Sequence, residues 1–343
     1  REIEGLLDGL GLQHALVAPA FPAMGRITVN GYHRVNGVLI SETAFANDPF
    51  WPITESYLPA LLSRQTSRPV GHLPLAIVEM GEEAIRAALE SEKADIVVAD
   101  AVEPDHMRSL AHALAQLWDR WLPCGSAGLA EEWPWALGLR REACKSPLWS
   151  PKPYPALVVA GSRNPSTAQQ LQLAAQESGM ELIRPSVDGG WTADSLNIAA
   201  KLLSQGRNVA LTTTFSEYRE GQGNEVAAAL ARAVSGVIRL LQRQPREETG
   251  WGAPHERSDR PPPLQANPPI AGIFMTGGDI ARAVCRELGA TALRALGEVQ
   301  PGIPAGLLVG GPLDGTRVVT KAGGFGDQSS IARSIRFLRG ETA

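Results

Sequence analysis

The sequence is poor in cysteine and has no long apolar stretch. Its 343 residues include three cysteines, Cys124, Cys144 and Cys285, and no CxxC pair. An odd number of widely separated cysteines offers no disulfide framework and is typical of a reducing compartment. The longest apolar runs have the length of a strand, and the first residues lack the basic head and cleavage site of a signal peptide. We therefore expect a soluble, cytoplasmic protein that has no membrane partner.

Positive charge is not in excess either. The 32 Lys and Arg residues against 36 Asp and Glu give a net charge of −4, so the composition predicts no nucleic-acid partner. The six histidines show no metal-ligand spacing, and no zinc site is predicted. The motifs GxxxxGK[ST], GxGxxG and GxSxG are absent, which excludes a Walker A loop, a Rossmann fingerprint and a hydrolase nucleophile elbow.

Short β-rich apolar runs alternate with segments of helical periodicity along the chain, a pattern typical of βα units around a parallel sheet. A proline-rich segment at 145–155 interrupts the pattern and is interpreted as a linker. We predict an α/β protein of two domains, residues 1–150 and 155–343, each with a mainly parallel sheet flanked by helices. The expected strands are 14–20, 72–80, 94–102, 156–162, 180–186 and 208–214, the expected helices are 82–93, 103–121, 164–179, 192–206 and 224–244, and strand–loop–helix units are expected at 271–290 and 316–339.

A β-hairpin is predicted between the first two strands. The segment RITVNGYHRVNGVLIS at 26–41 contains the dipeptides Asn30-Gly31 and Asn36-Gly37, flanked by alternating residues. Asn-Gly supplies the positive φ angles that two-residue hairpin turns require. Far along the chain, the polar stretch 244–269 is expected to be an exposed loop.

Three loops rich in glycine or serine follow predicted strands of the second domain. They are GSRNPST at 161–167, TGGD at 276–279 and KAGGFGD at 321–327. Ligands of an open parallel sheet bind where the strands end, and glycine lets backbone N–H groups approach an anion. For each loop alone, a purely structural turn explains the residues equally well. Three such loops at one edge would form a phosphate or nucleotide site.

These segments resemble the four-carbon acid sugar kinases. The resemblance rests on FMTGGDIARAVCRELGA and TRVVTKAGGFGD near the C-terminus, and on VAPAFPAMGRITVNGYHRVNGVLISETAFANDP and PCGSAGLAEEW in the first half. It implies an ATP-dependent kinase that phosphorylates a hydroxyl of a small sugar acid, with the acid in a cleft between the two domains. It also implies that residues 1–150 bind the acid and that residues 155–343 bind ATP and Mg²⁺.

Carried over by motif, the resemblance implies a nucleotide site in the three loops. Asp279 is then the catalytic base that deprotonates the acceptor hydroxyl, or a ligand that helps to hold Mg²⁺. The alternative is a helix N-cap, for which aspartate is a favoured residue. The residues implied to line the nucleotide are Ser162, Thr276, Gly277, Gly278, Asp279, Gly323 and Gly324.

A sugar acid needs a cationic partner for its carboxylate. Arg26, His33 and Arg34 in the predicted hairpin are candidates, and Arg163 or Lys321 are candidates from the second domain. Arginine can bind a carboxylate through two parallel hydrogen bonds. The alternative for each of them is a solvated surface charge.

Members of this family usually begin with a segment containing an Asp-Asp-Leu-Thr-Gly-Ala-type motif, which does not occur in this sequence. We therefore expect the first domain to be N-terminally incomplete, with an exposed sheet edge that a partner chain could cover. A homodimer is one such arrangement. A second function stays open, that of a catalytically degenerate relative that binds a nucleotide or metabolite. Whether 244–269 closes over ATP also stays open.

Overall fold

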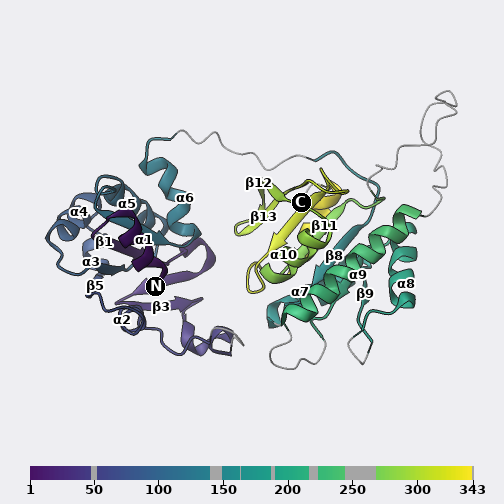
Figure 1. Cartoon of the computed structure of the whole chain (residues 1–343), viewed down its shortest axis with the longest axis horizontal. Coiled ribbons are helices and arrows are strands. Elements are labelled where there is room, and N and C mark those ends of the chain that lie inside the picture. The colour runs from purple at the N-terminus through teal and green to yellow at the C-terminus, as the bar shows by residue number, and fades with distance from the viewer. Residues whose placement is uncertain are drawn as a thin grey trace. The chain divides into compact units, whose positions relative to one another are not determined.

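The structure is a computed structural model that describes residues 1–47, 52–139, 149–162, 164–186, 190–215, 223–243 and 268–341. Its contacts divide the chain into two compact units, Arg1–Ala143 and Cys144–Ala343, called unit 1 and unit 2 here. Each unit has a sheet with parallel strands and flanking helices (Figure 1). The predicted α/β class is confirmed. Most of the expected loop 244–269, as well as Arg163, lies outside the described residues.

Unit 1 is built on a four-stranded parallel sheet with the order β5-β6-β1-β7. All four residues of its strand β6 are buried, as the unbroken apolar run of a parallel strand predicts. The strands are β1 (His14–Ala18), β5 (Val70–Leu73), β6 (Ile96–Ala99) and β7 (Trp121–Gly125), and the helices are α1 (Glu2–Leu10), α2 (Leu58–Ser63), α3 (Leu75–Val78), α4 (Glu82–Ser91), α5 (Pro104–Ala115) and α6 (Ala127–Ala136).

The predicted hairpin is confirmed as part of a small antiparallel sheet, β2-β3-β4. Asn30 and Gly31 join its first two strands with φ angles of 51° and 76°, the combination expected for a type I′ turn. Asn36 and Gly37 make the second turn with φ angles of 51° and 83°. The strands are β2 (Arg26–Val29), β3 (Tyr32–Val35) and β4 (Val38–Leu39), and three short 3₁₀ helices occupy Pro22–Met24, Ile40–Glu42 and Ala44–Asn47.

Two predictions in unit 1 are wrong in extent. The expected strand 72–80 ends at Leu73, because Pro74 lacks the N–H that the ladder needs and is the N-cap of the short helix α3. The expected helix 103–121 ends at Ala115, and Trp121 instead opens the edge strand β7, which the sequence analysis did not predict. There the Trp121 ring stacks on His14 at 4.7 Å between centroids.

Unit 2 has a seven-stranded sheet of order β12-β13-β14-β11-β8-β10-β9. Its strands from β14 to β9 are parallel, and the antiparallel β12 and β13 extend one edge. The sequence does not predict this extension, since four successive residues at the start of β12 are exposed and give no apolar pattern. The strands are β8 (Ala156–Ala160), β9 (Glu181–Ile183), β10 (Val209–Thr212), β11 (Gly272–Thr276), β12 (Ala292–Gln300), β13 (Ile303–Val309) and β14 (Arg317–Lys321).

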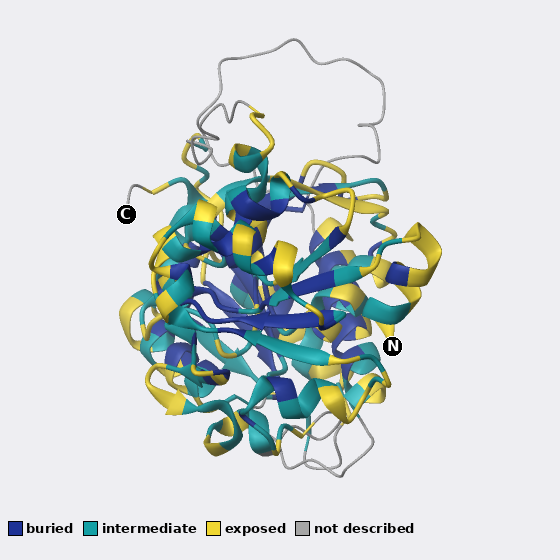
Figure 2. Cartoon of the chain, turned by 90° about the vertical axis from the view of Figure 1, so that its left-hand side faces the viewer, coloured by how far each residue is buried: buried dark blue, intermediate teal, exposed yellow. Residues whose placement is uncertain are grey.

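Helices cover both faces of this sheet. One apolar core joins α8, α9 and α10 to one face, and a second core joins α7 and α11 to the other. In Figure 2, where unit 1 faces the viewer, buried residues likewise concentrate in the strands and on the inner sides of the helices. The helices are α7 (Pro165–Ser178), α8 (Ala193–Ser204), α9 (Gly223–Arg243), α10 (Gly278–Glu287) and α11 (Ser330–Arg339).

Candidate nucleotide and substrate sites

The three glycine- or serine-rich loops lie side by side in unit 2. They follow β14, β11 and β8, which are neighbours in the sheet, and parallel strands end at one edge. The helices after β8 and β11 cover opposite faces, so a topological switch point lies between these strands, where open sheets bind ligands. The loops also touch: Gly277 N donates to Lys321 O at 2.9 Å, and Thr167 Oγ1 donates to Gly323 O at 3.0 Å. The structure thus brings the predicted nucleotide residues of the three loops together.

The TGGD loop leads from β11 into α10. Gly277 is the N-cap of α10 at a φ of 99°, a conformation open to glycine. A side chain on Gly278 would meet no atom within 4 Å, so space is open in front of the loop. Thr276 is fully buried, and its hydroxyl has no hydrogen-bond partner among the described residues. A buried hydroxyl without a partner is a group that a water or ligand could satisfy.

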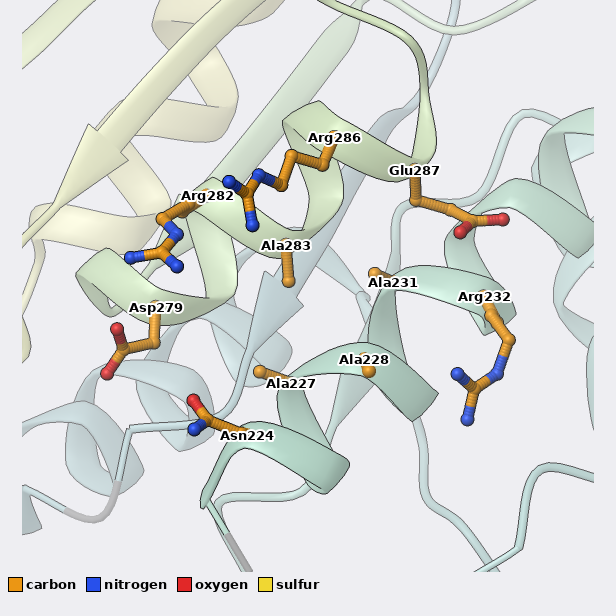
Figure 3. Close-up of a pocket in the computed structure, with 10 residues that line it drawn as sticks. All are labelled: Asn224, Ala227, Ala228, Ala231, Arg232, Asp279, Arg282, Ala283, Arg286 and Glu287. Carbon is orange, nitrogen blue, oxygen red and sulfur yellow. The ribbon is translucent and has the colours of Figure 1, made fainter.

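Asp279 is exposed and sits in the first turn of α10. The N-cap of this helix is Gly277, so the structure does not place Asp279 in the capping position. It lies at one end of a groove of about 410 Å³ between α9 and α10, shown in Figure 3. That volume is within the range of small-molecule sites, roughly 300–1,000 Å³. The groove is lined by Asn224, Ala227, Ala228, Ala231, Arg232, Asp279, Arg282, Ala283, Arg286 and Glu287.

Lys321 begins the third loop and is 3% exposed. Its Nζ donates to the carbonyl oxygens of Ala322 at 3.0 Å, Gly323 at 2.8 Å and Phe325 at 3.2 Å. Burial lowers the pKa of Lys321 to about 8, so the ammonium form still predominates at neutral pH. The amino group predicted to meet the sugar acid is therefore engaged with its own loop. Gly323 packs directly against the Ser162 hydroxyl of the first loop.

In unit 1, the hairpin carries the candidate substrate residues. Antiparallel pairing places Thr28 opposite His33, and Arg26 lies on the same face two residues before Thr28. The Arg26 guanidinium lies 5.5 Å from the centre of the Phe45 ring. Arg34 lies on the opposite face, where its guanidinium donates to Gly37 O.

His33 is buried, and its Nδ1 lies 3.1 Å from Thr28 Oγ1. Burial and then the charge of Arg26 lower the pKa of His33 to about 4. His33 is therefore uncharged at neutral pH and can offer hydrogen bonds, not a positive charge, to a carboxylate. Of the two predicted cationic partners in this pair, Arg26 is the one that carries charge.

Asp100 is a buried carboxylate that the sequence analysis did not single out. It follows β6 and is 0% exposed. Its oxygens accept hydrogen bonds from the backbone N–H groups of Asn30 at 2.8 Å, Gly31 at 2.9 Å and Leu75 at 3.1 Å. It therefore fixes the first hairpin turn to the carboxyl edge of the sheet. The sequence signal that could have indicated this role is the position of the aspartate, directly after the apolar run Ile96–Ala99.

Two features are absent from the described residues. Among them, no three His, Cys, Asp or Glu side chains gather as a metal-binding group. No helix in the described part of the chain is both long and apolar enough to cross a membrane.

Comparison with known proteins shows which class this fold and these loops define. A family described as a sugar-binding N-terminal domain matches residues 1–133, and one described as a nucleotide-binding C-terminal domain matches residues 264–331. A D-threonate kinase of Salmonella typhimurium is 32% identical over 334 residues, covering 94% of this chain and 74% of the relative. A D-erythronate kinase of Heliobacterium modesticaldum is 26% identical over 363 residues, covering 98% and 76%. The chain belongs to the four-carbon acid sugar kinase family, as its motifs suggested.

Solved structures agree on the fold. A protein of Salmonella typhimurium LT2 superposes with a TM-score of 0.68 at 22% identity, covering 98% of this chain and 76% of that protein. Haemophilus influenzae protein HI1011 does so with a TM-score of 0.61 at 19% identity, covering 97% and 76%.

Proposed function

We propose that the protein transfers the γ-phosphoryl group of ATP to a hydroxyl of a four-carbon sugar acid. The observation that carries this proposal is the meeting of three loops at the ends of β8, β11 and β14 beside a switch point of the sheet. Phosphoryl transfer is catalysed mainly by positioning and by charge stabilisation, and such loops can supply both to a triphosphate. The similar D-threonate and D-erythronate kinases support the class of acceptor.

Asp279 is the catalytic residue of this proposal. The acceptor oxygen forms its bond to the γ-phosphorus as the bond to the β-phosphate oxygen breaks, and the hydroxyl proton passes to the Asp279 carboxylate. Mg²⁺ is usually held by one or two carboxylates together with the phosphates. One exposed carboxylate beside the loops fits that mode, so Asp279 would also hold the metal, which neutralises charge on the phosphates. The groove between α9 and α10 then has room for the nucleoside of ATP.

Arg26 is the proposed partner of the acid's carboxylate in unit 1. Its guanidinium is partly buried, and burial lowers its pKa. Because the ordinary pKa of arginine is far above neutral pH, the guanidinium stays charged. His33, on the same face, would donate or accept a hydrogen bond with a hydroxyl of the acid.

The test is release of ADP from Mg-ATP with D-threonate, D-erythronate and 3-oxo-tetronate as acceptors. Asp279→Asn is expected to lower kcat about 10²–10⁴-fold, the usual contribution of a general base. Asp194→Asn is the matched control, because Asp194 is also exposed and also lies in the first turn of a helix, α8. Turnover that survives Asp279→Asn would remove the base from the proposal.

Arg26→Ala is expected to raise the KM for the acid about tenfold or more and to leave the KM for ATP unchanged. Arg34→Ala is the matched control on the other face of the hairpin. ATP binding without ADP release for any acid would instead favour the second function, a relative that binds a nucleotide without catalysis.

A further inference from the structure

We propose that Lys321, Thr167 and Gln170 shape the loop 322–326 into an anion-binding nest that receives a phosphate group, and that Lys321 acts as a positioning residue beneath it. The identity of the anion as a phosphate of ATP rests on the proposed function. The geometry of the nest rests on the structure of the loop itself.

Three buried polar side chains hold the carbonyl oxygens of this loop. Lys321, Thr167 and Gln170 are 3%, 0% and 1% exposed. The carbonyl oxygen of Gly323 accepts hydrogen bonds from both Thr167 Oγ1, at 3.0 Å, and Lys321 Nζ, at 2.8 Å. The carbonyl oxygen of Phe325 likewise accepts from both Gln170 Nε2 and Lys321 Nζ, each at 3.2 Å. Thr167 and Gln170 come from α7, so the loop is pinned from its own strand and from a helix about 150 positions earlier in the chain.

The direction of these carbonyls fixes the direction of the amides. The described backbone has no cis peptide bond, and in a trans peptide the N–H points opposite to the C=O of the same unit. The oxygens of Ala322 and Gly323 face Lys321 Nζ. The N–H groups of Gly323 and Gly324 therefore face away from it, and the structure gives them no hydrogen-bond partner among the described residues. Successive outward N–H groups of this kind form a concavity that binds anions.

Charge and position support the same ligand. The ammonium of Lys321 lies behind the two amides and adds a positive field in a setting with little water to screen it. The Ser162 hydroxyl packs against Gly323 and adds a further hydrogen-bonding group next to the nest. Polar groups are costly to bury unless they are hydrogen-bonded. Three of them are buried here around a single loop, which is the arrangement expected where backbone geometry must be held for a ligand.

The first experiment uses the unaltered chain. The dissociation constant of ATP is measured by calorimetry from pH 7.5 to 9.5, where the charge of ATP is constant because the last phosphate proton leaves near a pKa of about 6. Lys321 loses its proton across this range. We expect ATP to bind at least about tenfold more weakly at pH 9.5. Binding that is equally tight at both ends of the range would overturn the role of Lys321.

Variants separate positioning from direct contact with the acid. Lys321→Met is expected to weaken ATP binding about tenfold or more and to flatten its pH profile. Thr167→Val keeps the lysine and the shape of the side chain but removes one donor to Gly323, and should weaken ATP binding about threefold. Lys201→Met, on the exposed side of α8, is the control. A Lys321→Met chain that binds ATP normally but has a higher KM for the acid would show that Lys321 contacts the acid instead.

The two proposals can fail separately. If the unaltered chain binds ATP and the Thr167 and Lys321 variants bind it equally well, the nest is wrong and the kinase proposal stands. If the chain binds no ATP, the kinase proposal fails. A calorimetric titration with inorganic tripolyphosphate then tests whether the nest binds an anion. Loss of tripolyphosphate binding in Lys321→Met would support it, and no binding by the unaltered chain would contradict it.

Discussion

In each unit, the carboxyl ends of the parallel strands are organised by one buried charged side chain, and the two charges are opposite. In unit 1, Asp100 accepts hydrogen bonds from three backbone N–H groups. In unit 2, Lys321 donates to three backbone carbonyls. The buried charged residue thus holds backbone N–H groups in unit 1 and backbone carbonyl groups in unit 2.

This difference bears on what each edge can bind. Where Asp100 holds backbone N–H groups, the proposed partner of the acid's carboxylate is a side chain, Arg26. Where Lys321 draws carbonyls inward, amides face outward and the backbone itself suits an anion. The proposed binding groups therefore differ between the two edges: a side chain in unit 1 and backbone amides in unit 2.

Asp100→Ala should have the largest effect on this comparison. It removes the fully buried acceptor of three amide groups, of which that of Gly31 is buried and those of Asn30 and Leu75 are partly buried. Each buried group left unsatisfied costs roughly 1–3 kcal/mol. We expect the free energy of unfolding of unit 1 to fall by about 2–4 kcal/mol in urea titrations. Asp119→Ala, at an exposed position of the same unit, is the control. A loss below about 1 kcal/mol would mean that Asp100 does not organise the hairpin turn.

The second prediction separates the units by pH. The pKa of His33 is lowered from 6.5 to about 4, so the unfolded chain takes up a proton that the folded chain refuses as pH falls through this window. Unit 1 should lose up to about 3 kcal/mol of stability between pH 6.5 and 4, relative to His33→Gln.

For unit 2 the window lies in alkali. The pKa of Lys321 is lowered from 10.5 to about 8, so between these values the unfolded chain holds a proton that the folded chain has lost. Stability relative to Lys321→Met should be constant below pH 8 and rise by up to about 3 kcal/mol towards pH 10.5. Urea titrations at several pH values check both windows, and a stability difference independent of pH in either unit would contradict the assignment.

The smallest expected effect concerns two adjacent glycines of unit 2. Gly277→Ala forces a side chain into a φ of 99° and should cost about 1–3 kcal/mol. Gly278→Ala meets no atom within 4 Å at a helical position and should change stability by less than about 0.5 kcal/mol. Thermal unfolding of the pair measures the difference. Equal effects would show that the backbone of Gly277 is not what requires glycine in this loop.

Much of the architecture could be predicted from local features of the sequence. Asn30-Gly31 and Asn36-Gly37 predicted the hairpin because their backbone preference is local, and the apolar runs predicted the central strands because those strands are buried on both faces. The strand predicted through Pro74 and the helix predicted through Trp121 were wrong, because an apolar run of that length suits either element. Only the fold shows that a helix follows Pro74.

The site divides in the same way. Glycines after strands predicted that three loops would meet, since parallel strands share an edge. The role of Lys321 could not be predicted, because nothing in KAGGFGD shows that the amino group turns back onto its own loop. Thr167 and Gln170 were hidden for a similar reason. They are polar residues on a helix, and the loop to which they donate hydrogen bonds lies about 150 residues further along the chain.

Lys321 joins two loops through two different parts of one residue. Its carbonyl oxygen accepts the N–H of Gly277, and its side chain holds Ala322, Gly323 and Phe325. Neither loop can open widely without disturbing this residue. The hydrogen-bonded amides of the two loops, those of Gly277 and Phe325, should therefore exchange their hydrogens with a shared opening rate. A ligand that slows exchange at one of them will slow it at the other.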